Sequence, residues 1–186
     1  NIDQALLEIR HAEQRRAGSG YEVACRLLTR FPRMDYVERA APSGDERVPF
    51  LNRTIATCGR LPAELRTEID AAILQNEPTH AAAVLREVQR LAARERLADA
   101  STLLERSLER NEDDVDLWVA LVRVHLQNGS PEQARLVWKR AVSRGLNNAT
   151  LSEAQARIEA GLGEPDAMRA TLTRLRGQAR GDTSLV

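Results

Sequence analysis

The sequence predicts an all-α fold, a right-handed solenoid of helical hairpins, from an internal repeat and from its composition. The chain of 186 residues matches itself when it is shifted by 34 positions, a period typical of stacked helical hairpins. It is rich in the helix formers Ala, Leu, Glu and Arg, and it has 7 prolines and 10 glycines. A chain of this length can bury a core of its own.

The repeat is clearest between the segments 103–110 and 137–144. Apolar pairs correspond to apolar pairs, and two arginines correspond to arginines, at the offset of 34. The segments 129–135 and 163–169 share their Gly, Pro, acidic and Arg positions at the same offset. Agreement at one fixed offset indicates that one structural unit recurs along the chain.

The first helix of the middle unit is predicted over Asp116–Gln127. Its apolar residues recur with the spacing of one helix face. They are Trp118, Leu121, Val122 and Leu126. Gly129 is expected to end this hairpin arm, because glycine adopts the left-handed conformation that helix C-termini favour.

The second helix of the unit is predicted over 131–144. It begins at a proline, whose missing N–H costs nothing at the first helical position. Glu132 is spaced to pair with Arg135, and Asp166 with Arg169, at i and i+3.

The first 80 residues are less regular, and they predict degenerate helical hairpins. Helices are expected over Asp3–Arg16 and Tyr21–Arg30. A loop is expected over Ala41–Pro49, which is rich in Pro, Gly and Ser. Helices are expected again over Leu51–Thr57 and Pro62–Leu74.

The middle unit resembles a tetratricopeptide repeat (TPR). That pattern sets aromatic, Leu, Gly and small residues at fixed spacings over 34 positions. The residues at those spacings are Trp118, Leu121, His125, Gly129, Ala134, Trp138 and Ala141. The chain departs from the pattern at Val122, where a small residue is usual, at His125, where Tyr is usual, and at Leu146, where Pro closes the repeat.

The register of the middle unit divides the rest of the chain. Repeats are predicted at 81–114, 115–148 and 149–182, after a TPR-like segment at 1–80. Residues 183–186 are interpreted as the start of a further repeat or as a tail, so the chain is expected to be a fragment of a larger protein. The resemblance implies a TPR superhelix, which is a right-handed solenoid of helical hairpins.

Composition and motifs argue against several functions. The 27 basic and 27 acidic residues balance, whereas general nucleic-acid binders carry a cationic excess. No apolar run approaches the ~20 residues that span a bilayer, so this segment is not expected to insert into a membrane. No nucleophile, metal-ligand or phosphate-loop motif is present, and His11, His80 and His125 lie in separate segments. We therefore expect no enzyme activity, no metal and no cofactor.

Two other features of the sequence, an acidic cluster and a pair of cysteines, leave alternatives open. The acidic cluster at 113–116 suits helix capping, with a cation site as the alternative. Cys25 and Cys58 fit no metal motif, and buried free thiols are the favoured interpretation. The alternative is a disulfide between neighbouring helices, which would indicate an oxidising compartment.

The TPR resemblance implies a binding surface on the first helices of the repeats, which line the concave face. The candidate partner-binding residues are Gln89, Arg123, Gln127, Glu153 and Arg157. Of these, Gln89, Arg123 and Arg157 share one repeat position. Guanidinium groups bind carboxylates bidentately, so an acidic peptide segment is a candidate ligand. The alternative is that these arginines pair with Glu153 and other neighbouring acids.

The resemblance implies a non-enzymatic scaffold for protein–protein interactions in a bacterial assembly, with secretion and exopolysaccharide export as candidate processes. The partner is another protein or a peptide segment. The alternatives are a docking or regulatory domain of a larger enzyme and a chaperone for secreted proteins. A periplasmic location is slightly favoured over a cytoplasmic one.

Overall fold

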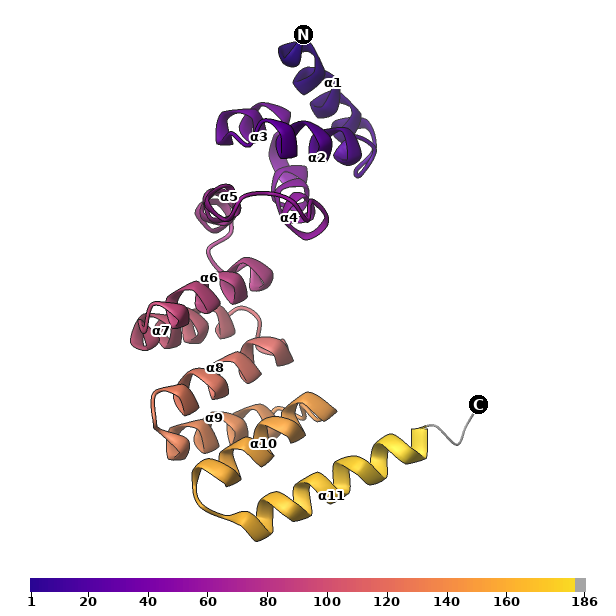
Figure 1. Ribbon diagram of the computed structural model, residues 1–186. Helices are drawn as coiled ribbons and strands as arrows, with labels where there is room; N and C mark the ends of the chain where they lie inside the picture. Colours follow the sequence, from indigo (N-terminus) through magenta and orange to yellow (C-terminus); the bar gives the residue numbers. More distant parts are fainter. Residues whose placement is uncertain (183–186) are drawn as a thin grey trace. The chain divides into compact units, whose positions relative to one another are not determined.

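The fold is all-α in the part of the chain that the structure describes (Figure 1). A computed structural model gives the backbone of residues 1–182 and the side chains of residues 1–177. The chain forms two compact units, Asn1–Glu87 (unit 1) and Val88–Val186 (unit 2). Among the described residues, no helix combines the length and the apolar character needed to cross a membrane. The expected tail at 183–186 lies outside the described residues.

Unit 1 consists of irregularly spaced α-helices of 7 to 14 residues around one apolar core. Its elements are α1 (Ile2–Arg15), α2 (Tyr21–Arg30), α3 (Met34–Ala40), a 3₁₀ turn η1 (Gly44–Glu46), α4 (Arg47–Thr57) and α5 (Ala63–Asn76). The core includes Leu28, Leu51 and Ile69, none of which is measurably exposed. Helix α6 (Ala81–Ala93) follows, and the boundary between the two units falls within it.

The sequence located most of these helices but not all of them. Helix α2 has the predicted bounds, and α1 and α5 differ from prediction by one or two residues at their ends. The seven-residue helix α3 was not predicted. The predicted loop over Ala41–Pro49 is wrong at its end, because α4 begins at Arg47 and includes Pro49. A proline is tolerated there because the first N–H groups of a helix have no partner within it.

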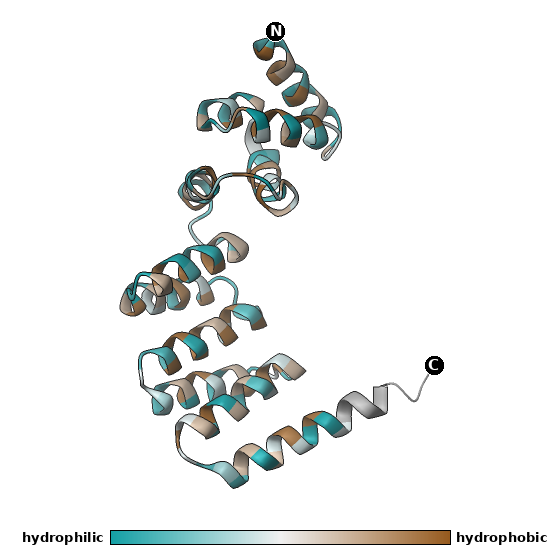
Figure 2. Ribbon diagram, viewed as in Figure 1, coloured by the Kyte–Doolittle hydropathy of each residue, from teal (hydrophilic) through white to brown (hydrophobic). Residues whose placement is uncertain are grey.

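Unit 2 is regular. Its helices after α6 are α7 (Leu97–Leu108), α8 (Val115–Gln127), α9 (Pro131–Ser143), α10 (Ala149–Gly161) and α11 (Pro165–Asp182). The starts of α6, α8 and α10, at residues 81, 115 and 149, are 34 apart, and so are those of α7, α9 and α11. Helix α8 packs on α7 and α9, and α10 packs on α8, α9 and α11. Hydrophilic and hydrophobic residues alternate along these helices (Figure 2).

The turns inside the hairpins repeat with the same period. Gly129 and Gly163 have positive φ angles of 67° and 70°, and Glu95, at the matching position of the preceding hairpin, has a φ angle of 59°. In each turn the next residue donates its N–H to a carbonyl five residues back at 2.9 Å, for example from Ser130 to His125. This pattern closes a helix C-terminus in the left-handed conformation.

Both tryptophans lie in unit 2, and Trp118 belongs to its core. Trp118 is 1% exposed, and its indole N–H donates to the carbonyl of Glu112 at 2.7 Å. Trp138 is half-buried and donates to the carbonyl of Leu151 at 3.0 Å, which ties α9 to α10. The guanidinium of Arg140 lies 5.3 Å from the centre of the Trp118 ring.

Near the helix ends, the contacts of charged side chains agree with the sequence-based predictions in two places and differ in one. Asp114 caps α8 by accepting the N–H groups of Asp116 and Leu117, so the acidic cluster caps a helix. Arg169 donates to Asp166 at 2.8 Å, as expected. The predicted Glu132–Arg135 pair is wrong, because Arg135 forms its ion pair with Glu164, at the start of the next hairpin arm.

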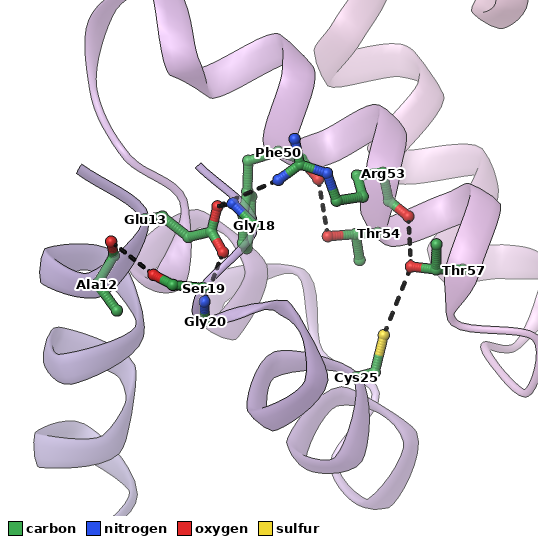
Figure 3. Close-up of polar contacts among 10 residues, drawn as sticks. All are labelled: Ala12, Glu13, Gly18, Ser19, Gly20, Cys25, Phe50, Arg53, Thr54 and Thr57. Carbon is green, nitrogen blue, oxygen red and sulfur yellow. Dashed lines mark hydrogen bonds and ion pairs between the residues drawn. The ribbon is translucent and has the colours of Figure 1, made fainter. Parts of the chain in front are cut away.

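A buried carboxylate organises the loop between α1 and α2 (Figure 3). The side chain of Glu13 is 2% exposed. Its two oxygens accept the backbone N–H groups of Gly18 at 2.8 Å and Gly20 at 2.7 Å. Arg53 of α4 lies 3.4 Å from the same carboxylate, so its charge is balanced from across the core.

Cys25 and Cys58 form a disulfide. The favoured expectation of two free thiols is therefore wrong, and the alternative holds. The bond joins α2 to the residue that ends α4, across a sequence separation of 33. Spacing alone could not decide the question, because pairing depends on how α2 and α4 pack.

Candidate protein-binding groove

Helices α8 and α10 place Arg123 and Arg157 at equivalent positions. The two arginines are 34 residues apart, both are exposed, and their helices pack on each other. Their neighbours Val122 and Ile158 are 1% exposed, so each helix buries one face and presents its arginine on another. The repeat therefore sets two guanidinium groups on adjacent helices of one surface.

A small depression of about 40 Å³ lies between these helices. Its lining residues on α8 are Val119, Val122, Arg123 and Leu126, and those on α10 are Thr150, Glu153, Ala154 and Arg157. Three of the five predicted site residues, Arg123, Glu153 and Arg157, therefore lie around one depression.

A larger depression of about 570 Å³ lies between α10 and α11. Its lining residues on α10 are Ala149, Glu153, Ala156, Arg157 and Ala160, and those on α11 are Met168, Leu172, Leu175 and Arg176. Because Glu153 and Arg157 line both depressions, the two adjoin. We call them together the α8–α10–α11 groove.

The charged side chains of the groove are not neutralised by one another. Within the described part of the chain, Arg123, Glu153 and Arg157 form no side-chain hydrogen bond or ion pair. The expected alternative, pairing of these arginines with Glu153, is not seen there. With Arg176, three arginines and one glutamate line the groove.

Two predicted site residues lie elsewhere. Gln89 is exposed on α6, and Gln127 is exposed at the end of α8, and neither lines the two depressions. The sequence pattern did not indicate that Arg176 or the apolar residues of α11 belong to a site. Leu172 occupies the position equivalent to Trp138, which predicts burial, yet it is 37% exposed.

The groove combines an apolar floor with separated cations. Alanine, leucine and methionine side chains can receive apolar groups of a ligand. Exposed guanidinium groups can donate two parallel hydrogen bonds to a carboxylate. The groove therefore suits a peptide segment with both apolar and acidic residues.

The described part of the chain contains no cluster of His, Cys, Asp and Glu that could hold a metal ion. His125 is half-buried on α8. The ring nitrogen Nδ1 of His80 accepts the N–H of Ala83 at 3.4 Å, at the start of α6. His11 is exposed on α1, so the three histidines lie in different segments of the chain.

The comparisons with known proteins show what part of unit 2 and the fold are similar to. Residues 91–158 match the tetratricopeptide repeat family model. The fold is similar to a solved structure of a MamA point mutant, with a TM-score of 0.58 and 17% sequence identity over 95% of this chain and 99% of that one. No curated protein sequence matches the chain. At this identity, the structural similarity concerns the fold alone.

Proposed function

We propose that this chain, a tetratricopeptide repeat protein over residues 91–158, is a non-enzymatic scaffold that binds other proteins through the α8–α10–α11 groove. The repeat fold supports an interaction scaffold, because stacked hairpins present an extended surface. The observation that carries the proposal is the groove itself, where unpaired arginines stand beside an apolar floor.

The proposed ligand is an extended or helical peptide segment that carries acidic and apolar residues. Arg123 and Arg157 would bind its carboxylates, and the floor between α10 and α11 would take its apolar side chains. A hydrogen bond to a charged group contributes roughly 1.5–3 kcal/mol, so two arginines can decide between acidic and basic partners.

Peptide selection with the full chain tests this proposal. We expect peptides selected from a random displayed library to combine acidic and apolar residues. Their affinity, measured by fluorescence anisotropy, should fall at least roughly tenfold in the Arg123→Glu/Arg157→Glu variant.

The matched control is Arg106→Glu/Arg110→Glu, which makes the same change in net charge at two exposed arginines outside the groove. It should keep the affinity of the unaltered chain. Equal loss in both variants, or selection of basic peptides, would contradict the proposed role of the groove.

A finer part of the proposal places the scaffold in the bacterial envelope, in an assembly for secretion or exopolysaccharide export. The Cys25–Cys58 disulfide supports this location, because disulfides persist in oxidising compartments. Thiol trapping in the native cells tests it. The two cysteines should resist alkylation until a reductant is added, whereas free thiols in the cells would contradict an envelope location.

A chaperone for secreted proteins is the second candidate, favoured by the apolar floor of the larger depression. A chaperone would bind unfolded chains mainly by their apolar residues. Suppression of aggregation of a reduced, unfolded test protein would then persist in Arg123→Glu/Arg157→Glu. Loss of suppression in that variant would favour the acidic-segment scaffold.

A further inference from the structure

Helix α10 carries polar residues at three positions where the equivalent helix of the preceding repeat, α8, has larger buried or half-buried side chains. At the offset of 34, the α8 residues Trp118, Leu121 and His125 correspond to Ser152, Gln155 and Glu159 of α10. Burial of a polar group is unfavourable unless the group is hydrogen-bonded. This polar row is therefore unexpected from the repeat pattern.

Glu159 is the most enclosed residue of that row. It is 7% exposed. Its Oε1 accepts from the amide of Gln155 at 2.7 Å. Its Oε2 is buried and has no hydrogen-bond partner among the described residues. A buried carboxylate oxygen without a donor destabilises the fold, so a donor from outside would restore a favourable interaction.

Glu159 lines a pocket of about 240 Å³ between α9 and α10. We call it the Glu159 pocket. Its lining residues are Arg135, Trp138, Lys139, Gln155, Ile158, Glu159 and Glu164. None of them lines the α8–α10–α11 groove, so the pocket is a separate feature of the same unit.

The other charges of the pocket do not satisfy Glu159. Arg135 pairs with Glu164. Lys139, the one lysine of the sequence, is exposed and forms no ion pair within the described part of the chain. The carboxylate of Glu159 thus remains available to a cation, with Lys139 as an internal competitor.

We propose that the Glu159 pocket binds a basic side chain, lysine or arginine, of a partner protein. The ammonium or guanidinium group would donate to Oε2 of Glu159 after a small rotation of the carboxylate about its last bond, which is a soft torsion. The aliphatic stem of the ligand would pack on Ile158 and on the indole of Trp138. An aromatic wall also favours a cation.

A protein side chain suits this pocket better than a metal ion. Glu159 is the only carboxylate of the lining that is not already in an ion pair, and a metal ion requires several oxygen ligands. The apolar wall of the pocket has no ligand atoms for a metal ion, whereas the aliphatic stem of a lysine or arginine would make contacts there.

NMR titration of the full chain tests the proposal. The probes are Nα-acetyl-lysinamide and Nα-acetyl-argininamide, with Nα-acetyl-norleucinamide as the uncharged comparison. We expect saturable shifts of the Trp138 indole N–H signal and of the Gln155 side-chain amide with the two basic probes only.

Variants then identify the group that binds. Glu159→Gln should weaken binding at least roughly tenfold, because it removes the charge and keeps the size. Lys139→Met should tighten binding, because it removes the competing ammonium and keeps the stem. Glu132→Gln, at an exposed carboxylate on α9 outside the pocket, is the matched control and should leave binding unchanged.

Three results would overturn the proposal. They are no saturable shift with either basic probe, unchanged binding in Glu159→Gln when its spectrum shows the native fold, and loss of binding in Lys139→Met. The last result would mean that Lys139 contributes to binding of the probe instead of competing with it. Each of these readouts is independent of Arg123 and Arg157, so failure here leaves the groove proposal standing.

Discussion

At the scale of single residues, buried or strained side chains set the most specific constraints. Glu13 accepts two backbone N–H groups of the loop after α1 while only 2% of its side chain is exposed. No other residue type offers two acceptor oxygens of this strength at that position, apart from a shorter aspartate. The loop conformation therefore depends on this one carboxylate.

We predict that Glu13→Ala lowers the free energy of unfolding of unit 1 by roughly 3 kcal/mol, because the N–H groups of Gly18 and Gly20 and the charge of Arg53 lose their partner. Chemical denaturation followed by circular dichroism measures the change. Gln14→Ala, at the exposed neighbouring residue, is the control and should have little effect. A small effect of Glu13→Ala would mean that water replaces the carboxylate in the loop.

Among the described residues, Glu95 is the one non-glycine residue with a positive φ angle. Its φ angle of 59° lies in the left-handed region, where the equivalent turns use glycine. We predict that Glu95→Gly raises the free energy of unfolding of unit 2 by about 1 kcal/mol, since relief of the strain exceeds the added flexibility of the unfolded chain.

The control for that substitution runs in the opposite direction. Gly129→Ala places a side chain at a φ angle of 67° and should destabilise unit 2 by about 1 kcal/mol. Both values can be measured by urea denaturation. Destabilisation by Glu95→Gly would show that the glutamate side chain, rather than the turn geometry, stabilises that hairpin.

At the scale of elements, the periodicity of the sequence predicts the repeated hairpins but not the helices that lie outside the repeat. The hairpins of unit 2 begin at intervals of 34 residues, and the glycines and prolines that mark them are visible in the sequence. Helix α3 has 7 residues, which is too short for an apolar pattern to identify it. The start of α4 was missed because Pro49 suggested a loop, although proline is compatible with a first helical turn.

The candidate site also contains residues that the repeat pattern predicted and residues that it did not predict. The repeat register placed Arg123, Glu153 and Arg157 on the predicted binding face, and these three line one depression. Gln89 shares the repeat position of the two arginines but does not line it. Arg176 and Leu172 could not be predicted, because their exposure depends on how α11 packs against α10. Ion pairs also depend on tertiary packing. Arg135 pairs with Glu164 of the next hairpin and not with Glu132, three residues earlier on the same helix.

At the scale of the whole molecule, the two units are stabilised differently. Unit 2 relies on contacts between neighbouring hairpins, as repeat proteins do. Unit 1 adds links between residues distant in sequence: the Cys25–Cys58 disulfide and the ion pair of Arg86 with the fully buried Asp70. The disulfide limits the freedom of the unfolded chain. The ion pair acts in the folded unit, where the arginine balances the buried charge of Asp70.

We predict that reduction of the disulfide lowers the free energy of unfolding of unit 1 by roughly 3–4 kcal/mol, the value expected for a closed loop of this size. Hydrogen exchange of peptides from α2 and α4, with and without reductant, measures the effect. Peptides from α8 and α9 provide the internal control and should exchange at unchanged rates. Equal acceleration in both units would contradict an effect limited to unit 1.

Because of the distribution of aromatic residues, intrinsic fluorescence can follow one unit separately from the other. Trp118 and Trp138 are the two tryptophans of the sequence, and both lie in unit 2, whereas Tyr21 and Tyr36 lie in unit 1. Excitation at the red edge of the protein absorption band therefore reports on unit 2 alone. The unaltered chain already carries a fluorescent reporter for one unit, and Trp138 stands in the wall of the Glu159 pocket, where quenching would reveal an occupant without any added label.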